Sequence, residues 1–193
     1  KEINLVTLLA CNEVLTRHGV MTICSRTCDE DDSVSQEVKE ANQSGAAIAV
    51  SFHANAGGGD GFEAYYYEGD EEGKRLAQLG EKYVKALGQN SRGVKDGRKL
   101  RFINGTKMTA VLFESFFLDN KMDKQIGDAQ KEQQELGVAY AKAILEYLRI
   151  PYQEQSVWYC VQVGAYKKKE NANRMLQELK KAGFTECFLH TRV

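Results

Sequence analysis

The order of apolar and polar positions along the chain predicts helices alternating with short strands over its first 150 residues. Apolar residues recur at helical spacing in residues 2–17, 71–87 and 125–149. Short apolar runs between polar turn residues favour buried strands. We expect strands at residues 20–24, 48–52, 62–67, 100–103 and 109–113, a polar loop at 89–97, and a helix at 33–44 that opens with a capping box of Ser33 and Gln36. This alternation predicts an α/β domain of layered helices and strands.

The chain after Pro151 has a different pattern and predicts a second, smaller module. Pro151 is the only proline, and residues 151–156 are typical of a linker. Beyond it we expect a strand at 157–163, a basic amphipathic helix at 168–182 and a strand at 185–190. So short a segment cannot bury a core unaided. The sequence therefore predicts two domains, residues 1–150 and 157–193, of which the second is part of a module.

Composition excludes several classes of protein. With 193 residues and 42% hydrophobic content, the chain can bury one core and a small module. It has no run of 18 apolar residues, so we expect no membrane span, and no signal-peptide pattern is visible at its start. The net charge is −1, and residues 157–193 hold seven Lys/Arg against three Asp/Glu. This small excess of positive charge is far less than nucleic-acid-binding proteins usually carry, so we expect no nucleic-acid partner.

The five cysteines do not indicate a disulfide framework. They are odd in number and contain no CxxC pair, which argues against both paired disulfides and a cysteine zinc site. We expect free thiols, most of them packed.

His53 is the first candidate for chemistry. It follows the apolar run 48–52, and the glycine-rich loop 57–61 comes soon after it. Open α/β sheets place ligands just past the carboxyl ends of strands, and glycines let a backbone approach a ligand closely. His53 is therefore a candidate metal ligand. A hydrogen-bonded loop histidine is the alternative interpretation.

Glu114 is the second candidate, because the apolar run 109–113 leads directly into it. A carboxyl group desolvated by Phe113, Phe116 and Phe117 would have a raised proton affinity, which suits a general acid or base. A surface glutamate, or a charge at a helix N-terminus, is the alternative. If both candidates serve one site, their side chains must converge from neighbouring strand ends.

Several motifs together resemble a known family. They are SFHANA at Ser51–Ala56, GFE at Gly61–Glu63, RGVK at Arg92–Lys95, LRFIN at Leu100–Asn104 and AVLFESFFLDN at Ala110–Asn120. In this order they are similar to the zinc-dependent N-acetylmuramoyl-L-alanine amidases of bacterial cell-wall hydrolases and phage endolysins. The resemblance covers residues 1 to about 149.

The resemblance implies a twisted, mostly parallel sheet flanked by helices, with one Zn²⁺ held by two histidines and a glutamate. His53 matches the family's second histidine, a metal ligand, and Glu114 matches its catalytic glutamate. The glutamate ligand is expected immediately before Lys1, and Glu2 is not in its position. The first histidine belongs to a glycine-rich turn after the family's opening strand, which is expected further upstream. The implied activity is hydrolysis of the amide bond between N-acetylmuramic acid and L-alanine, in the cell wall or outside the cell.

Residues 158–166, WYCVQVGAY, with Asn171, Leu176 and Gly183 resemble the start of a sporulation-related (SPOR) repeat. Such domains bind glycan strands that lack stem peptides, so the resemblance implies peptidoglycan and denuded glycan as partners. Trp158 and Tyr166 as plain core aromatics remain the alternative. For the whole chain, a noncatalytic wall-binding or regulatory protein, or a metallo-carboxypeptidase acting on free peptides, also remain open.

Overall fold

The computed structural model describes residues 2–29, 33–155 and 161–191, and these form two units, Lys1–Gln153 and Glu154–Val193. The first unit contains a four-stranded sheet in the order β1-β4-β2-β3. The strands are β1 (Ile48–Asn55), β2 (Phe62–Tyr66), β3 (Ser91–Asp96) and β4 (Thr109–Phe117). Strand β4 runs parallel to β1 and antiparallel to β2, and β2 runs parallel to β3. This mixed sheet, flanked by helices, confirms the predicted α/β class.

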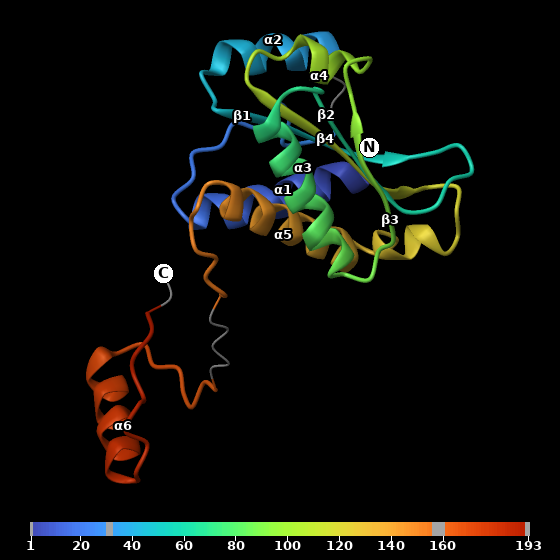
Figure 1. The fold of residues 1–193 in the computed structure, drawn as a ribbon. Helices are drawn as coiled ribbons and strands as arrows, with labels where there is room; N and C mark the ends of the chain where they lie inside the picture. Colours follow the sequence, from blue (N-terminus) through green and yellow to red (C-terminus); the bar gives the residue numbers. More distant parts are fainter. Residues whose placement is uncertain (1, 30–32, 156–160, 192–193) are drawn as a thin grey trace. The chain divides into compact units, whose positions relative to one another are not determined.

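Three helices cover one face of the sheet and enclose the main core (Figure 1). They are α1 (Glu2–Arg17), α3 (Glu71–Lys85) and α5 (Gln130–Tyr147). The ring of Phe113 on β4 stacks on Tyr140 of α5, with 4.6 Å between the ring centroids. Gly80 of α3 lies directly against the same Phe113 ring, so the absence of a side chain there lets α3 pack closely on β4. The predicted helices at 2–17 and 71–87 are confirmed within two residues.

Two shorter helices cover part of the opposite face (Figure 1). They are α2 (Val34–Ser44) and α4 (Arg101–Gly105). The Ser33 side chain accepts a hydrogen bond from the Gln36 backbone N–H, which is one of the two bonds of the predicted capping box, and the Gln36 side chain donates to Glu40. A small apolar cluster lies beneath these helices, formed by Val38, Ala49, Tyr65, Leu100, Phe102, Ile103, Ala110 and Leu112.

Three predictions for the first unit were wrong. Residues 91–96, expected as loop, form β3, which is polar because it lies at the edge of the sheet. Residues 100–103, expected as a strand, belong mostly to α4, where Phe102 and Ile103 are both buried. Adjacent residues of a strand point to opposite faces, whereas both of these pack into one cluster.

Residues 20–24 are the third wrong prediction. Their burial alternates, as in an extended segment, with Met21 and Ile23 at 97% and 73% exposure. Within the described residues they pair with no other strand, so the alternation reflects extended backbone without a ladder.

The helix predicted at 125–149 is α5 preceded by a 3-10 turn, η1 (Asp123–Ile126). In the second unit α6 (Lys169–Lys181) confirms the predicted basic helix. The strand predicted at 185–190 is wrong, because these residues form neither helix nor strand. Most of the strand predicted at 157–163 lies outside the described residues, and residues 161–163 form no strand. None of the described helices is long and apolar enough to cross a membrane.

Candidate active site

Three ionisable side chains form a row across the sheet. His53 of β1 is in register with Glu114 of β4, and Glu114 is in register with Glu63 of β2. Residues paired across strands project to the same face. Along β4, Glu114 shares its face with Ala110 and Leu112, which lie in the small apolar cluster. His53, Glu114 and Glu63 therefore lie on the same face of the sheet as that cluster, which is the face that α2 and α4 partly cover.

His53 was predicted to lie just past the end of a strand, but it lies inside β1, because the strand continues to Asn55. Its Nε2 atom lies 2.9 Å from the Ser51 hydroxyl oxygen, and the two groups share a hydrogen bond. Burial lowers the pKa of His53, and the positive charge of Arg26 lowers it further. The imidazole is therefore held neutral, the form in which histidine binds metals.

Glu114 also lies inside its strand, since β4 extends to Phe117. Its Oε2 atom is buried and has no hydrogen-bond partner among the described residues. Burial raises the pKa of Glu114 to about 7, with a further contribution from the negative charge of Glu63. An unpartnered buried oxygen with a pKa near neutrality can both accept and release a proton under ordinary conditions.

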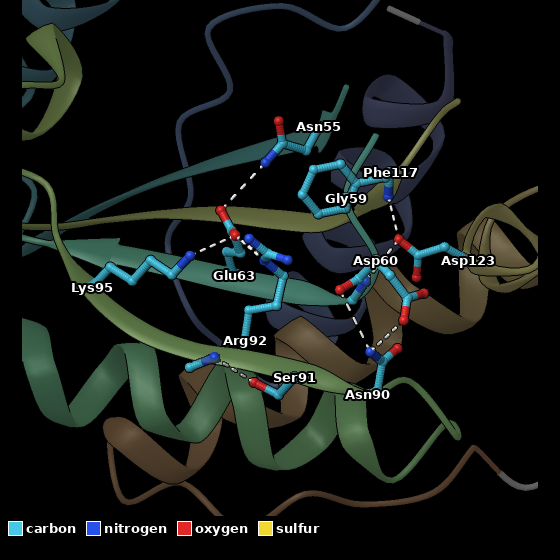
Figure 2. Close-up of polar contacts among 12 residues, drawn as sticks. Asn55, Gly59, Asp60, Glu63, Asn90, Ser91, Arg92, Lys95, Phe117 and Asp123 are labelled. Atoms are coloured by element: carbon cyan, nitrogen blue, oxygen red, sulfur yellow. Dashed lines mark hydrogen bonds and ion pairs between the residues drawn. The ribbon is translucent and has the colours of Figure 1, made fainter. Parts of the chain in front are cut away.

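Glu63 is only 3% exposed and is the centre of a dense hydrogen-bond network (Figure 2). Its Oε1 atom accepts hydrogen bonds from Arg92 Nε and Lys95 Nζ, each at 2.5 Å. Its Oε2 atom accepts from the Tyr65 hydroxyl at 2.6 Å and from Asn55 Nδ2 at 3.3 Å. Burial alone would raise the pKa of Glu63, but the bonds from Lys95, Tyr65 and Arg92 lower it on balance. Glu63 is therefore a fixed carboxylate beside Glu114.

Two aspartates fix the glycine-rich loop between β1 and β2. Asp119 accepts hydrogen bonds from the backbone N–H groups of Gly57 and Gly58, at 2.9 and 2.8 Å, and these bonds lower its pKa. Buried Asp123 accepts from the N–H groups of Gly61 and Phe117 at 2.9 and 2.6 Å (Figure 2). These bonds tie the loop to the chain that follows β4.

Comparison with known proteins identifies the family. Residues 1–146, more than half of the chain, match the N-acetylmuramoyl-L-alanine amidase family. The chain belongs to this family. Residues 155–186 of the same chain match the SPOR domain.

Individual amidases are similar over most of the chain. The sporulation-specific N-acetylmuramoyl-L-alanine amidase of Bacillus subtilis (strain 168) is 29% identical over 193 residues, covering 98% of this chain and 75% of that protein. The amidase CwlM of Bacillus licheniformis is 29% identical over 194 residues, with 98% and 76% covered. The solved catalytic domain of CwlV from Bacillus (Paenibacillus) polymyxa var. colistinus is 29% identical and superposes with a TM-score of 0.71, covering 78% of this chain and 85% of that domain.

The residues that the structure describes contain only part of the zinc site implied by the family resemblance. The neutral imidazole of His53 and the unpartnered Glu114 Oε2 fit the chemistry of such a site. However, the described residues contain no group of three or more His, Cys, Asp or Glu side chains that could hold a metal ion. A catalytic zinc needs three protein ligands. The described residues alone therefore do not form a complete zinc site.

The structure brings His53 and Glu114 together, as convergence on one site requires, although their roles remain predictions. Sequence reasoning did not single out Glu63, which lies opposite Glu114, or its partners Arg92 and Lys95. The sequence could have indicated a role for Glu63. It is a charged residue between Phe62 and Ala64 in an otherwise apolar strand, and a buried charge is costly unless it has a partner. The four cysteines in the described residues are free, as predicted: Cys11 is buried, Cys24 and Cys187 are partly buried and Cys28 is exposed.

Proposed function

We propose that this amidase chain hydrolyses peptidoglycan at the amide bond between N-acetylmuramic acid and L-alanine. The observation that carries the proposal is the placement of Glu114, unpartnered and with a pKa near 7, in register with His53 in a chain of the amidase family. This pairing offers a proton acceptor and a neutral metal ligand on the same face of one sheet. Noncatalytic wall binding would need neither.

Glu114 is the proposed general base and acid. Its free Oε2 is available to accept a proton from an attacking water molecule. The same carboxyl then donates a proton to the leaving nitrogen of L-alanine, since an amine is a poor leaving group unless it is protonated. A pKa of about 7 suits both transfers, because neither direction is strongly uphill at neutral pH.

His53 is the proposed metal ligand, and Zn²⁺ the proposed cofactor. When bound, zinc supplies a Lewis acid that polarises the amide carbonyl and lowers the pKa of a coordinated water molecule. Burial of His53 disfavours the imidazolium form, so the ring keeps a nitrogen lone pair for the metal. The hydrogen bond with Ser51 fixes the orientation of the ring.

The C-terminal unit is proposed to bind glycan. Residues 157–193 would form part of a SPOR-type module that binds denuded glycan strands, and residues 1–150 would form the catalytic domain. The SPOR match at residues 155–186 supports this division. Because its substrate is cell-wall peptidoglycan, the protein would act outside the cell or in the wall.

Mass spectrometry of the soluble products tests this function. Purified peptidoglycan, incubated with the full-length protein and Zn²⁺, should release stem peptides with a free L-alanine amino group, leaving glycan without peptides. Glu135→Gln, at an exposed position of α5, is a matched control and should release the same products. Free single amino acids from the peptide C-terminus would indicate a carboxypeptidase instead. Binding without any released product would favour the noncatalytic alternative.

A further inference from the structure

Glu63 holds two cationic side chains on the site's face of the sheet (Figure 2). Arg92 and Lys95 both donate to the Oε1 atom of Glu63 from β3, whose register against β2 shifts between Phe62 and Ala64. The Arg92 guanidinium lies over the Phe117 ring, 5.5 Å from its centroid, and Lys95 Nζ lies 6.0 Å from the Tyr65 ring centroid. Carboxylate and rings together fix both cations in position.

This pair carries more positive charge than Glu63 neutralises. Two cations share one carboxylate, so the group has a net charge of about +1. Both side chains also reach solvent, since 46% of Arg92 and 34% of Lys95 is exposed, whereas the Glu63 side chain is only 4% exposed. Arg92 bonds Glu63 through Nε, and a guanidinium carries further N–H donors on its two terminal nitrogens. The Lys95 ammonium has three N–H donors, and the printed bond to Glu63 uses one of them. A second anion can therefore bind without displacing Glu63.

The pair lies within reach of a substrate held at Glu114. Glu63 and Glu114 are directly opposite in an antiparallel pair, which places their Cβ atoms about 4.5–5.5 Å apart. The cations lie one hydrogen bond beyond Glu63. An extended peptide advances about 3.3–3.6 Å per residue. A peptide whose scissile amide lies at Glu114 thus reaches the cations within about two residues.

We propose that Arg92 and Lys95, positioned by Glu63, form an anion subsite that binds the free carboxylate of the stem peptide's second residue. The inference rests on the proposed amidase function, because it takes the stem peptide as substrate. The second residue of the stem peptide is a glutamyl residue whose α-carboxylate is free in some cell walls and converted to a carboxamide in others. The subsite selects the free form, since two cationic donors bind a carboxylate more strongly than a neutral amide.

A binding titration tests the subsite without requiring hydrolysis. The probes are two L-alanyl-D-glutamyl dipeptides whose side-chain carboxyl is capped as an N-methylamide, one with a free α-carboxylate and one with an α-carboxamide. Dissociation constants are measured by NMR titration of the zinc-free protein at low ionic strength. We expect the free carboxylate to bind about 5-fold more tightly, or about 1 kcal/mol. This preference should shrink with added salt.

Variants assign the preference to the two cations. Arg92→Gln and Lys95→Gln should each reduce it to about 2-fold or less, because one cation then remains for two carboxylates. Lys95→Arg keeps the charge and should keep the preference, as should Lys85→Gln at an exposed site on α3. Circular dichroism confirms that each variant is folded. Equal binding of the two probes by the native chain, or an undiminished preference in both Gln variants, would overturn the subsite.

The subsite and the amidase function can fail separately. A chain that releases stem peptides from peptidoglycan but binds both probes equally is an amidase without this subsite. A chain that releases no stem peptide but prefers the free carboxylate, and loses that preference in Arg92→Gln, retains the subsite and contradicts the proposed function.

Discussion

At the scale of single residues, the site depends on the different surroundings of two neighbouring glutamates, Glu63 and Glu114. Glu63 is buried but surrounded by four donors, and its pKa falls. Glu114, on the next strand, has a buried oxygen without a donor, and its pKa rises to about 7. Each carboxyl takes its character from the groups around it, and the charged Glu63 strengthens the proton affinity of Glu114. Glu63 is thus a fixed carboxylate, and Glu114 is the carboxyl group that can exchange a proton.

The raised pKa of Glu114 predicts a pH dependence of stability in the metal-free protein. Between the pKa of about 4.5 in the unfolded chain and about 7 in the folded chain, the folded state binds more protons, so stability falls as pH rises through this window. Because Glu114 is partly exposed, we expect a loss of about 1–2 kcal/mol between pH 5 and pH 8.

Urea unfolding at pH 5 and pH 8 measures this loss. Glu114→Gln cannot titrate, so the native chain should lose about 1–2 kcal/mol more than the variant does over the same range. An equal pH dependence in both proteins would show that Glu114 does not have the raised pKa.

At the scale of elements, strongly periodic segments could be predicted from the sequence, and segments defined by their neighbours could not. Helix α3 follows its apolar stripe, and α2 its Ser33 cap. Strand β3 is polar and is a strand because it pairs in parallel with β2. The local sequence pattern of residues 91–96 contains no information about this pairing. Likewise, His53 could be recognised as a candidate, but its alignment with Glu114 and Glu63 depends on the strand order β1-β4-β2.

Close packing of α3 on β4 predicts that Gly80→Ala is destabilising. The added Cβ would overlap the Phe113 ring, and overpacking of a core typically costs about 1–3 kcal/mol. This outweighs the gain of about 1 kcal/mol that alanine brings within a helix. Gln78→Ala, at an exposed position of the same helix, is the control and should stay within about 0.5 kcal/mol of the native chain. A more stable Gly80→Ala protein by urea unfolding would refute the close packing.

At the scale of the whole molecule, the chain combines an amidase unit with a separate C-terminal unit. The main core lies entirely within the first unit, between the sheet and α1, α3 and α5. In the second unit, the described part of the chain contains one helix, α6, with no buried residue. Catalysis and glycan binding are therefore expected to reside in different parts of the chain.

Removal of residues 154–193 tests this division. Since the amidase core ends before this point, the shortened chain should melt within about 2 °C of the full chain, a shift that corresponds to less than about 1 kcal/mol. In a sedimentation assay with denuded glycan, the full chain should be retained and the shortened chain should not. A large drop in melting temperature would contradict the independence of the first unit, and equal retention would contradict the glycan role of the second.

The most direct test of the central claim is the rate at which stem peptides are released by the native full-length protein and by its Glu114→Gln variant, both supplied with Zn²⁺ and intact peptidoglycan. Glutamine keeps the shape of the side chain but cannot accept a proton, and loss of a general base typically costs about 10²–10⁴-fold in rate. We predict a loss of that size, with zinc content equal in the two proteins by elemental analysis. Release by Glu114→Gln at near the native rate would contradict the account.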